Sequence, residues 1–225
     1  MRTRLLEWVL PAEDPAWARL PTPDDLAGKS APSPAAGNER LDELLPTKDY
    51  GALRDELSST PVDRRMDWLK HRLLDGGTAF LAFRYINHLD HLWKTGVAPD
   101  DPDKDMRITA GGIALYAYQL IVIDGAKCED QSTADMHMRD LLRQRAVTHL
   151  KKQPVETRIK VVDLALRMEQ ATAQKRQDDD WLCRGGARAP APFRYVAKFL
   201  PSERYAPLQE KARASMREQL LALVK

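Results

Sequence analysis

The sequence predicts an all-α protein, an irregular bundle of about seven or eight helices with an extended N-terminal arm and one disulfide. Apolar residues recur at spacings of three and four along most of the chain, which is typical of amphipathic helices. No stretch shows the period-two alternation of a half-buried strand. The two cysteines, Cys128 and Cys183, each follow an expected helix in a short turn-forming segment. These three observations lead to the predicted fold.

The arm is expected to cover residues 1–37, before a single helical domain at 38–225. Prolines and glycines are so frequent between positions 11 and 37 that a helix of any length is not expected there. Trp8 and Trp17 at the start of this stretch need an apolar surface to dock on. The body of the same molecule is the favoured surface, and a partner protein is the alternative.

The first helices of the domain are expected to include a hairpin. Two short helices are predicted at 39–45 and 50–57. A longer helix begins with Thr60 as N-cap, followed by proline and, two residues later, aspartate, and it ends at two glycines, 76–77. The next helix covers about 78–94, so the two long helices are antiparallel neighbours.

A core helix is expected at about 108–123, because its apolar stretch is continuous yet shorter than a membrane span. No transmembrane segment is therefore predicted. Ser132, with an aspartate three residues later, is expected to cap the next helix, which ends before Pro154. Pro154 begins a long amphipathic helix that ends near residue 177. Short and long helices are then predicted at 193–200 and 207–224.

Cys128 and Cys183 do not form a CxxC pair, and charged, turn-forming residues surround both, which favours a disulfide between two loops. On the chain-entropy model such a bond removes about 4 kcal/mol of unfolded-state freedom. The alternative is two ordinary buried thiols. A disulfide implies a periplasmic or otherwise exported protein, whereas free thiols leave a cytoplasmic location open. No export signal is visible at the start of the chain, so a leader absent from this chain is expected.

The net charge of +2 conceals an asymmetry between the two parts of the chain. Residues 1–136 hold 16 basic and 23 acidic residues, and residues 137–225 hold 19 basic and 10 acidic ones. The basic residues alternate with acidic ones along helices and lack base-stacking aromatics, so nucleic acid is not an expected partner. Solvated helix faces are the simpler interpretation.

Two charged loops are candidate interaction surfaces. Asp101, Asp103 and Asp105 have the spacing that opens a calcium loop, but methionine and glycine replace the required turn glycine and bidentate glutamate. A solvated, partner-facing acidic loop is favoured instead. A glycine-rich turn with two arginines could form an anion-binding nest, although a sharp turn beside the disulfide is the simpler interpretation. The candidate interaction residues are Asp100, Asp101, Asp103, Asp105, Arg184 and Arg188.

The sequence contains no recognisable catalytic or metal motif. His88 and His91 are spaced as two ligands on one helix face, with His71 across the hairpin, but a partner motif for a metal is lacking. No GxSxG elbow or other nucleophile motif occurs. We therefore expect no cofactor, and an enzyme is less expected than a binding protein.

The paired motifs Asp-Gly-x-x-Cys (residues 124–128) and Trp-x-Cys-Arg-Gly-Gly (residues 181–186) resemble a pattern of uncharacterised helical proteins exported by Gram-negative bacteria. The resemblance covers roughly residues 107–200. It implies an envelope location and a disulfide, and it implies no activity or functional residue.

The function expected from the sequence is protein binding in the bacterial envelope, most concretely an immunity protein or an inhibitor of a secreted effector. Charge complementarity around an apolar anchor would give such a protein its specificity. One alternative is an enzyme or a small-molecule or metal binder with an inter-helix pocket that uses His88, His91 or Arg184. Another is a structural adaptor of a secretion system. The sequence leaves the oligomeric state open.

Overall fold

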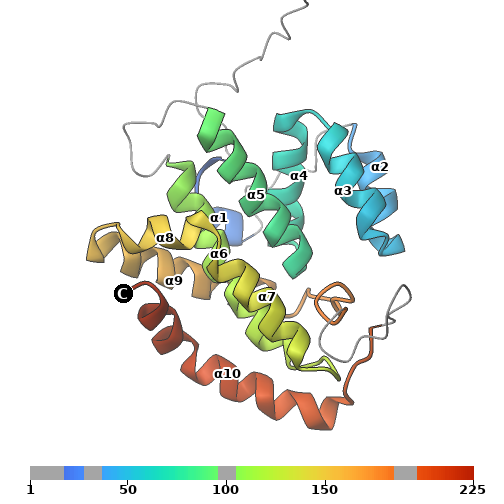
Figure 1. Cartoon of the computed structure of the whole chain (residues 1–225), viewed down its shortest axis with the longest axis vertical. Helices are drawn as coiled ribbons and strands as arrows, with labels where there is room; N and C mark the ends of the chain where they lie inside the picture. Colours follow the sequence, from blue (N-terminus) through green and yellow to red (C-terminus); the bar gives the residue numbers. More distant parts are fainter. Residues whose placement is uncertain (1–17, 28–36, 96–104, 185–196) are drawn as a thin grey trace, which may run out of the picture.

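A computed structural model describes residues 18–27, 37–95, 105–184 and 197–225 (Figure 1). These ranges contain ten α-helices and no strand, which confirms the all-α prediction with more helices than the seven or eight expected. The elements are α1 (Pro23–Leu26), α2 (Glu39–Leu44), the 3-10 helix η2 (Leu45–Thr47), α3 (Tyr50–Ser59), α4 (Val62–Leu74), α5 (Ala79–Thr95), α6 (Met106–Gly125), α7 (Ser132–Leu142), α8 (Arg145–Lys151), α9 (Val155–Thr172) and α10 (Ser202–Leu223).

α6 is the central helix of the bundle, as its continuous apolar sequence predicts. α5, α7, α8, α9 and α10 all pack against it (Figure 1), and most of its residues are buried. By length and composition alone α6 could cross a membrane, and 78% of its most apolar window is buried inside the molecule. It contributes to both hydrophobic clusters, one shared mainly with α2–α5 and α7 and the other with α9 and α10.

The described part of the N-terminal arm lies on the body of the molecule. Ala18 is buried, and its carbonyl accepts a hydrogen bond from the Thr109 hydroxyl of α6 at 2.7 Å. A Cβ on Gly112 would come within 2.5 Å of Leu20, so the glycine permits this close approach. The expectation that no helix forms here is wrong for α1, because a Thr22 capping box stabilises one turn. Trp8 and Trp17 lie outside the described residues.

α4 and α5 form the predicted hairpin. Gly76 adopts a φ of 90° at the turn, a conformation that favours glycine. Two predicted caps are wrong. Thr60 is the C-cap of α3, and its hydroxyl donates back to the Glu56 carbonyl instead of accepting from α4. Ser132 is the first residue of α7, where the Asp130 carboxylate accepts from its backbone N–H.

The segment between Ser132 and Pro154 contains two helices where one was expected. α7 ends at Leu142, and the extended backbone of Gln144 precedes α8. Neither glycine nor proline marks this break in the sequence. α8 packs near the start of α6, where Leu150 faces Gly111, and α7 packs near its end, where Ala134 faces Gly125.

Two C-terminal predictions also need correction. Residues 197–200 of the expected short helix are not helical, and Leu200 donates a backbone hydrogen bond to the Lys127 carbonyl at 2.7 Å; residues 193–196 lie outside the described part. The last helix begins at Ser202, not at Pro207, and Pro201 is its N-cap. Pro207 is therefore inside the helix and lacks one backbone donor there.

Candidate functional site

The disulfide predicted from the sequence is present. Cys128 and Cys183 are both buried, and their Cα atoms are 5.1 Å apart. The bond joins the connection between α6 and α7 to residues 177–184, here called the Trp181 segment. This segment is not helical, so the crosslink holds an irregular stretch of chain against the bundle.

Asp179 attaches the Trp181 segment to the start of α5. Its buried carboxylate accepts hydrogen bonds from the backbone N–H groups of Ala79 at 2.8 Å and Leu182 at 3.2 Å. Burial raises the pKa of Asp179 to about 6, the backbone hydrogen bonds oppose the rise, and the charge of Asp124 adds to it. One covalent bond and one buried carboxylate thus contribute to holding the segment in place.

These two attachments place the indole of Trp181 in a cluster of rings. Its centroid lies 5.7 Å from that of Phe80 and 5.4 Å from that of Phe83, both on α5. The imidazole of His137 on α7 is 4.1 Å away. The backbone N–H of Trp181 also donates to the Tyr50 hydroxyl at 3.3 Å. The rings therefore connect α3, α5 and α7 around a fixed tryptophan.

A hollow of about 340 Å³, here called the Trp181 pocket, lies beside this cluster. Helices α3 and α5 supply its walls, and the Trp181 segment supplies the indole. Its lining is unusual because aromatic rings and guanidinium groups occur together. The lining residues are Tyr50, Gly51, Arg54, Phe80, Phe83, Arg84, Asn87 and Trp181.

The two arginines of the Trp181 pocket differ in their partners. Arg54 forms an exposed ion pair with the adjacent Asp55 at 2.8 Å. Arg84 is half-buried, and within the described residues it makes no hydrogen bond and no ion pair. Burial lowers the pKa of Arg84, and the positive charge of Arg54 lowers it further. The pocket therefore contains a cation without a counter-ion.

His88 lies one turn after Arg84 on α5. Burial lowers the pKa of His88 to about 3, and the charges of Arg65 and Arg84 contribute. Its Nε2 is buried without a hydrogen-bond partner among the described residues, whereas His91 is exposed. In the described ranges no three His, Cys, Asp or Glu side chains gather as metal ligands. His88 and His91 therefore do not form a metal centre with His71.

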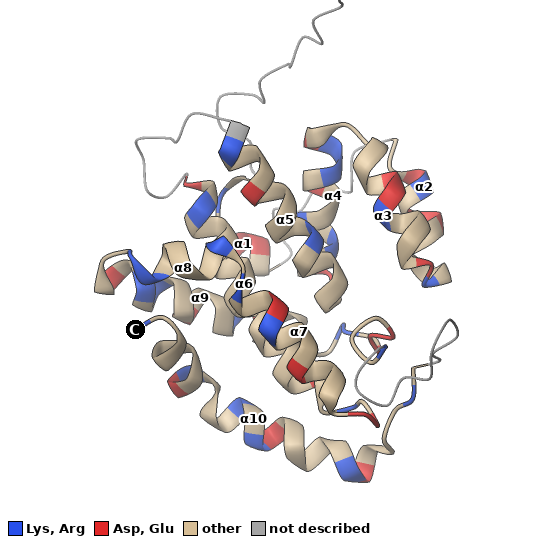
Figure 2. Cartoon of the chain, viewed as in Figure 1, with Lys and Arg blue, Asp and Glu red and all other residues tan. Residues whose placement is uncertain are grey.

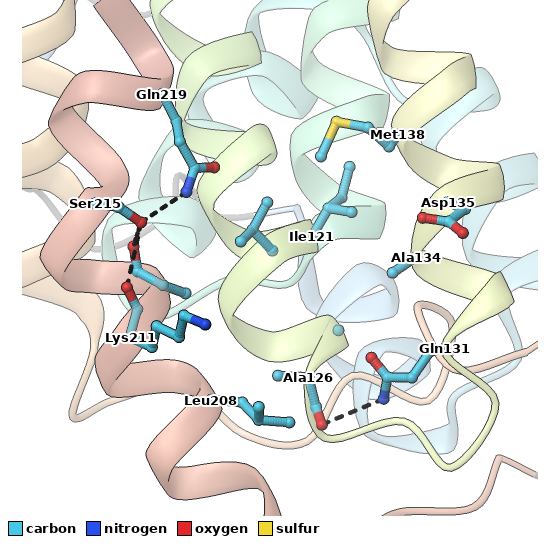
Figure 3. Close-up of a pocket in the computed structure, with 13 residues that line it drawn as sticks. Ile121, Ala126, Gln131, Ala134, Asp135, Met138, Leu208, Lys211, Ser215 and Gln219 are labelled. Atoms are coloured by element: carbon cyan, nitrogen blue, oxygen red, sulfur yellow. Dashed lines mark hydrogen bonds between the residues drawn. The ribbon is translucent and has the colours of Figure 1, made fainter.

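A second hollow, of about 400 Å³, lies between α7 and α10, and α6 forms its floor (Figure 3). We call it the α7–α10 groove. Figure 3 shows Ile121 and Met138 facing the hollow from α6 and α7, with Leu208 and Lys211 on the α10 side. The lining is apolar at the centre and polar at the edges. It consists of Ile121, Val122, Gly125, Ala126, Gln131, Ala134, Asp135, Met138, Leu208, Lys211, Ala212, Ser215 and Gln219.

The acidic-loop candidates do not form a described surface. Asp100, Asp101 and Asp103 lie outside the described residues. Asp105 is only 6% exposed, so its prediction as a solvated interaction residue is wrong. Its carboxylate caps α6 by accepting from the Arg107 backbone at 2.8 Å and pairs with the Arg107 side chain at 2.7 Å.

The two arginines predicted as interaction residues, Arg184 and Arg188, do not form a common described site. Arg188 lies outside the described residues. The guanidinium of Arg184 is over the Tyr50 ring at 5.2 Å and is 4.0 Å from the Asp180 carboxylate. Arg184 therefore contacts Tyr50, which lines the Trp181 pocket, although Arg184 itself does not line it.

A buried ion-pair network joins α6, α9 and α10. Arg176 pairs with Asp124 at 2.9 Å and with Glu169 at 2.7 Å, and Arg213 reaches the same Glu169 oxygen at 3.1 Å. Their side-chain exposures are 3% for Arg176, 8% for Asp124 and 6% for Glu169. We call this set the Arg176 network. Every charge in it has a partner, so it connects α6, α9 and α10 and offers no open site.

Sequence reasoning did not find Arg54 and Arg84. A signal was available for Arg84, because it interrupts the apolar run from Phe80 to Ile86. Comparison of the chain with protein-family models, curated proteins and solved structures finds no match. The two hollows, the disulfide and the charges are therefore the observations on which a functional proposal rests.

Proposed function

We propose that this chain is a non-enzymatic protein-binding module of the bacterial envelope that inhibits, or gives immunity to, a secreted effector. The observation that carries the proposal is the α7–α10 groove. α10 packs on α6 and α9, and its side toward α7 is left open by the hollow. An open apolar channel between helices suits an amphipathic helix of a partner protein.

The lining of the groove supports a helical occupant. Ala134 of α7, Ala212 of α10 and Ala126, which directly follows α6, are small, so a partner backbone can approach closely. Leu208 is 47% exposed at the α10 edge and provides an apolar contact. Asp135 on α7 and Lys211 on α10 carry opposite charges on the two edges. A partner helix with complementary charges would be bound in one direction.

The charge pattern supports a protein partner over nucleic acid. Figure 2 shows basic and acidic residues alternating along α10 instead of a continuous basic face. The disulfide supports the envelope location, because such bonds persist in oxidising compartments.

The test is capture of partners from the native envelope with the full chain, followed by affinity measurement on the captured protein. Leu208→Glu should weaken that affinity at least tenfold, because a charge would enter the apolar contact. Leu142→Glu is the matched control, since Leu142 is 41% exposed on α7 and does not line the groove. Equal affinity of the two variants for every captured protein would rule out the groove as the binding surface.

A further inference from the structure

We propose that the Trp181 pocket binds a small organic anion whose carboxylate or phosphate pairs with Arg84 and Arg54 and whose flat apolar body contacts the indole of Trp181. This site is separate from the α7–α10 groove, so the inference does not depend on the proposed protein partner. It rests on three features: an uncompensated cation, an aromatic wall and a preformed shape.

The first feature is the charge. Arginines are almost never fully buried without a partner, because removal of a charge from water is costly, and the Nε of the half-buried Arg84 is buried without one among the described residues. Arg84 has no such partner in the described residues, and the charge that lowers its pKa together with burial is another guanidinium, that of Arg54. An anion bound between Arg54 and Arg84 would remove their mutual repulsion and supply the missing charge-assisted hydrogen bonds.

The second feature is the wall. Tyr50, Phe80, Phe83 and Trp181 line the same hollow as the two arginines. Aromatic faces and edges favour a flat apolar group, and a guanidinium beside them favours an oxyanion. Asn87 on α5 adds a polar group that can both donate and accept. A metal cation or a basic ligand would be repelled by the arginines.

The third feature is the preformed shape. The disulfide at Cys183 and the hydrogen bonds of Asp179 hold the Trp181 segment on both sides of the indole. Little conformational entropy is then lost when a ligand binds. The volume of about 340 Å³ is at the small end of ligand sites, which fits one substituted ring.

The test uses the full chain with its disulfide intact and four probes in calorimetric titrations. Phenylacetate and phenyl phosphate present the two oxyanions, and phenylacetamide is the neutral match. N-acetyl-alanyl-phenylalanine with a free C-terminus tests whether the anion is the end of a peptide. At least one anion should bind with a Kd of about 1 mM or tighter, and the amide at least tenfold more weakly.

Two variants locate the binding. Arg84→Met should weaken anion binding at least tenfold. Gly51→Leu should fill the pocket from α3; a Cβ there meets the Asp49 carboxylate at 3.3 Å, so that side chain must shift by a few tenths of an ångström. Arg167→Met, at an exposed position on α9, is the control and should bind as the parent does.

The outcomes decide both the site and the source of the anion. Binding of phenylacetate or phenyl phosphate identifies a free small molecule, and binding of the peptide acid alone identifies a chain terminus. Measurable binding of phenylacetate and phenylacetamide with equal affinity would overturn the proposal. So would unchanged affinity in Arg84→Met and Gly51→Leu, or no binding of any anion at about 10 mM.

Discussion

The Arg176 network and the Trp181 pocket both contain arginines that are partly or fully buried. They differ in whether a carboxylate of the chain pairs with the buried charge. Arg176 is 97% buried in its side chain and contacts two carboxylates, Asp124 and Glu169. Arg84 is half-buried and contacts none among the described residues. The first cluster is complete within the chain, whereas the second has room for an anion from outside.

This difference separates a structural role from a binding role. A buried ion pair seldom adds much net stability, but removal of one partner is costly because the other charge remains buried. An unpaired, partly buried cation lowers the stability of the folded state even without any mutation. Such a cation at a pocket is explained if it binds a ligand. Substitution of an arginine by methionine should therefore have opposite effects in the two places.

The largest expected effect belongs to Arg176→Met. The substitution leaves Asp124 without its ion pair to Arg176 and leaves Glu169 with Arg213 alone. We expect the free energy of unfolding to fall by about 3–5 kcal/mol, measured by urea denaturation at pH 7. Arg167→Met on the exposed face of α9 should change it by less than about 0.5 kcal/mol. Similar values for the two variants would contradict a structural role for the network.

The next effect concerns the disulfide that shapes the Trp181 pocket. Replacement of both Cys128 and Cys183 by alanine should lower the free energy of unfolding by about 2–4 kcal/mol, because the unfolded chain regains freedom. Anion binding should weaken as well, since the Trp181 segment then loses its covalent attachment and keeps only its non-covalent contacts, among them those of Asp179 and of the Trp181 N–H. Urea denaturation and the phenylacetate titration measure the two effects. Retained affinity in the folded double variant would show that the crosslink does not preorganise the pocket.

The sequence predicted the features that depend on local patterns. The spacing of apolar residues located the hairpin α4–α5 and the core helix α6, and Gly76 marked the turn between α4 and α5. The break between α7 and α8 was missed, because packing on α6 places it and no glycine or proline signals it. The cap at Thr60 was wrong because its hydroxyl satisfies a carbonyl of the preceding helix.

The candidate site was less predictable than the fold. The pairing of Cys128 with Cys183 followed from their number and setting. The pocket did not, because Arg54 and Trp181 are far apart in the sequence and meet only in the folded molecule. For Asp105 the sequence predicted a site residue that the structure does not support. Its position in an acidic run indicated a solvated loop, yet its side chain is buried and caps a helix.

The third prediction is a pH dependence that comes from Asp179. Its pKa of about 6 in the folded state is above the ordinary value of 3.8. Below pH 3.8 the carboxyl is protonated in both states and its favourable contribution is complete; this contribution is lost as the pH rises through 6, where the folded state must hold a buried charge. The parent should therefore gain up to about 3 kcal/mol relative to Asp179→Asn between pH 7 and pH 4.

Urea denaturation of both proteins at pH 4, 5, 6 and 7 measures this difference. Other groups also titrate in this range, so the comparison between the two proteins isolates Asp179. The charge of Asp124 is one cause of the raised pKa. A constant difference across the four pH values would mean that the Asp179 carboxyl is not desolvated by the Trp181 segment.

The smallest expected change in the free energy of unfolding comes from a substitution at Arg84 in the Trp181 pocket. Arg84→Met keeps an unbranched side chain and removes the unpaired charge, so the free energy of unfolding should rise by about 1 kcal/mol at pH 7. Loss of that charge should also raise the pKa of His88 from about 3, measured by NMR titration of its imidazole. The pKa should stay below 6.5, because burial is the main cause of its depression. A destabilised variant with an unchanged His88 pKa would mean that Arg84 is paired in solution, and the Trp181 pocket would then lose the free cation that an organic anion needs.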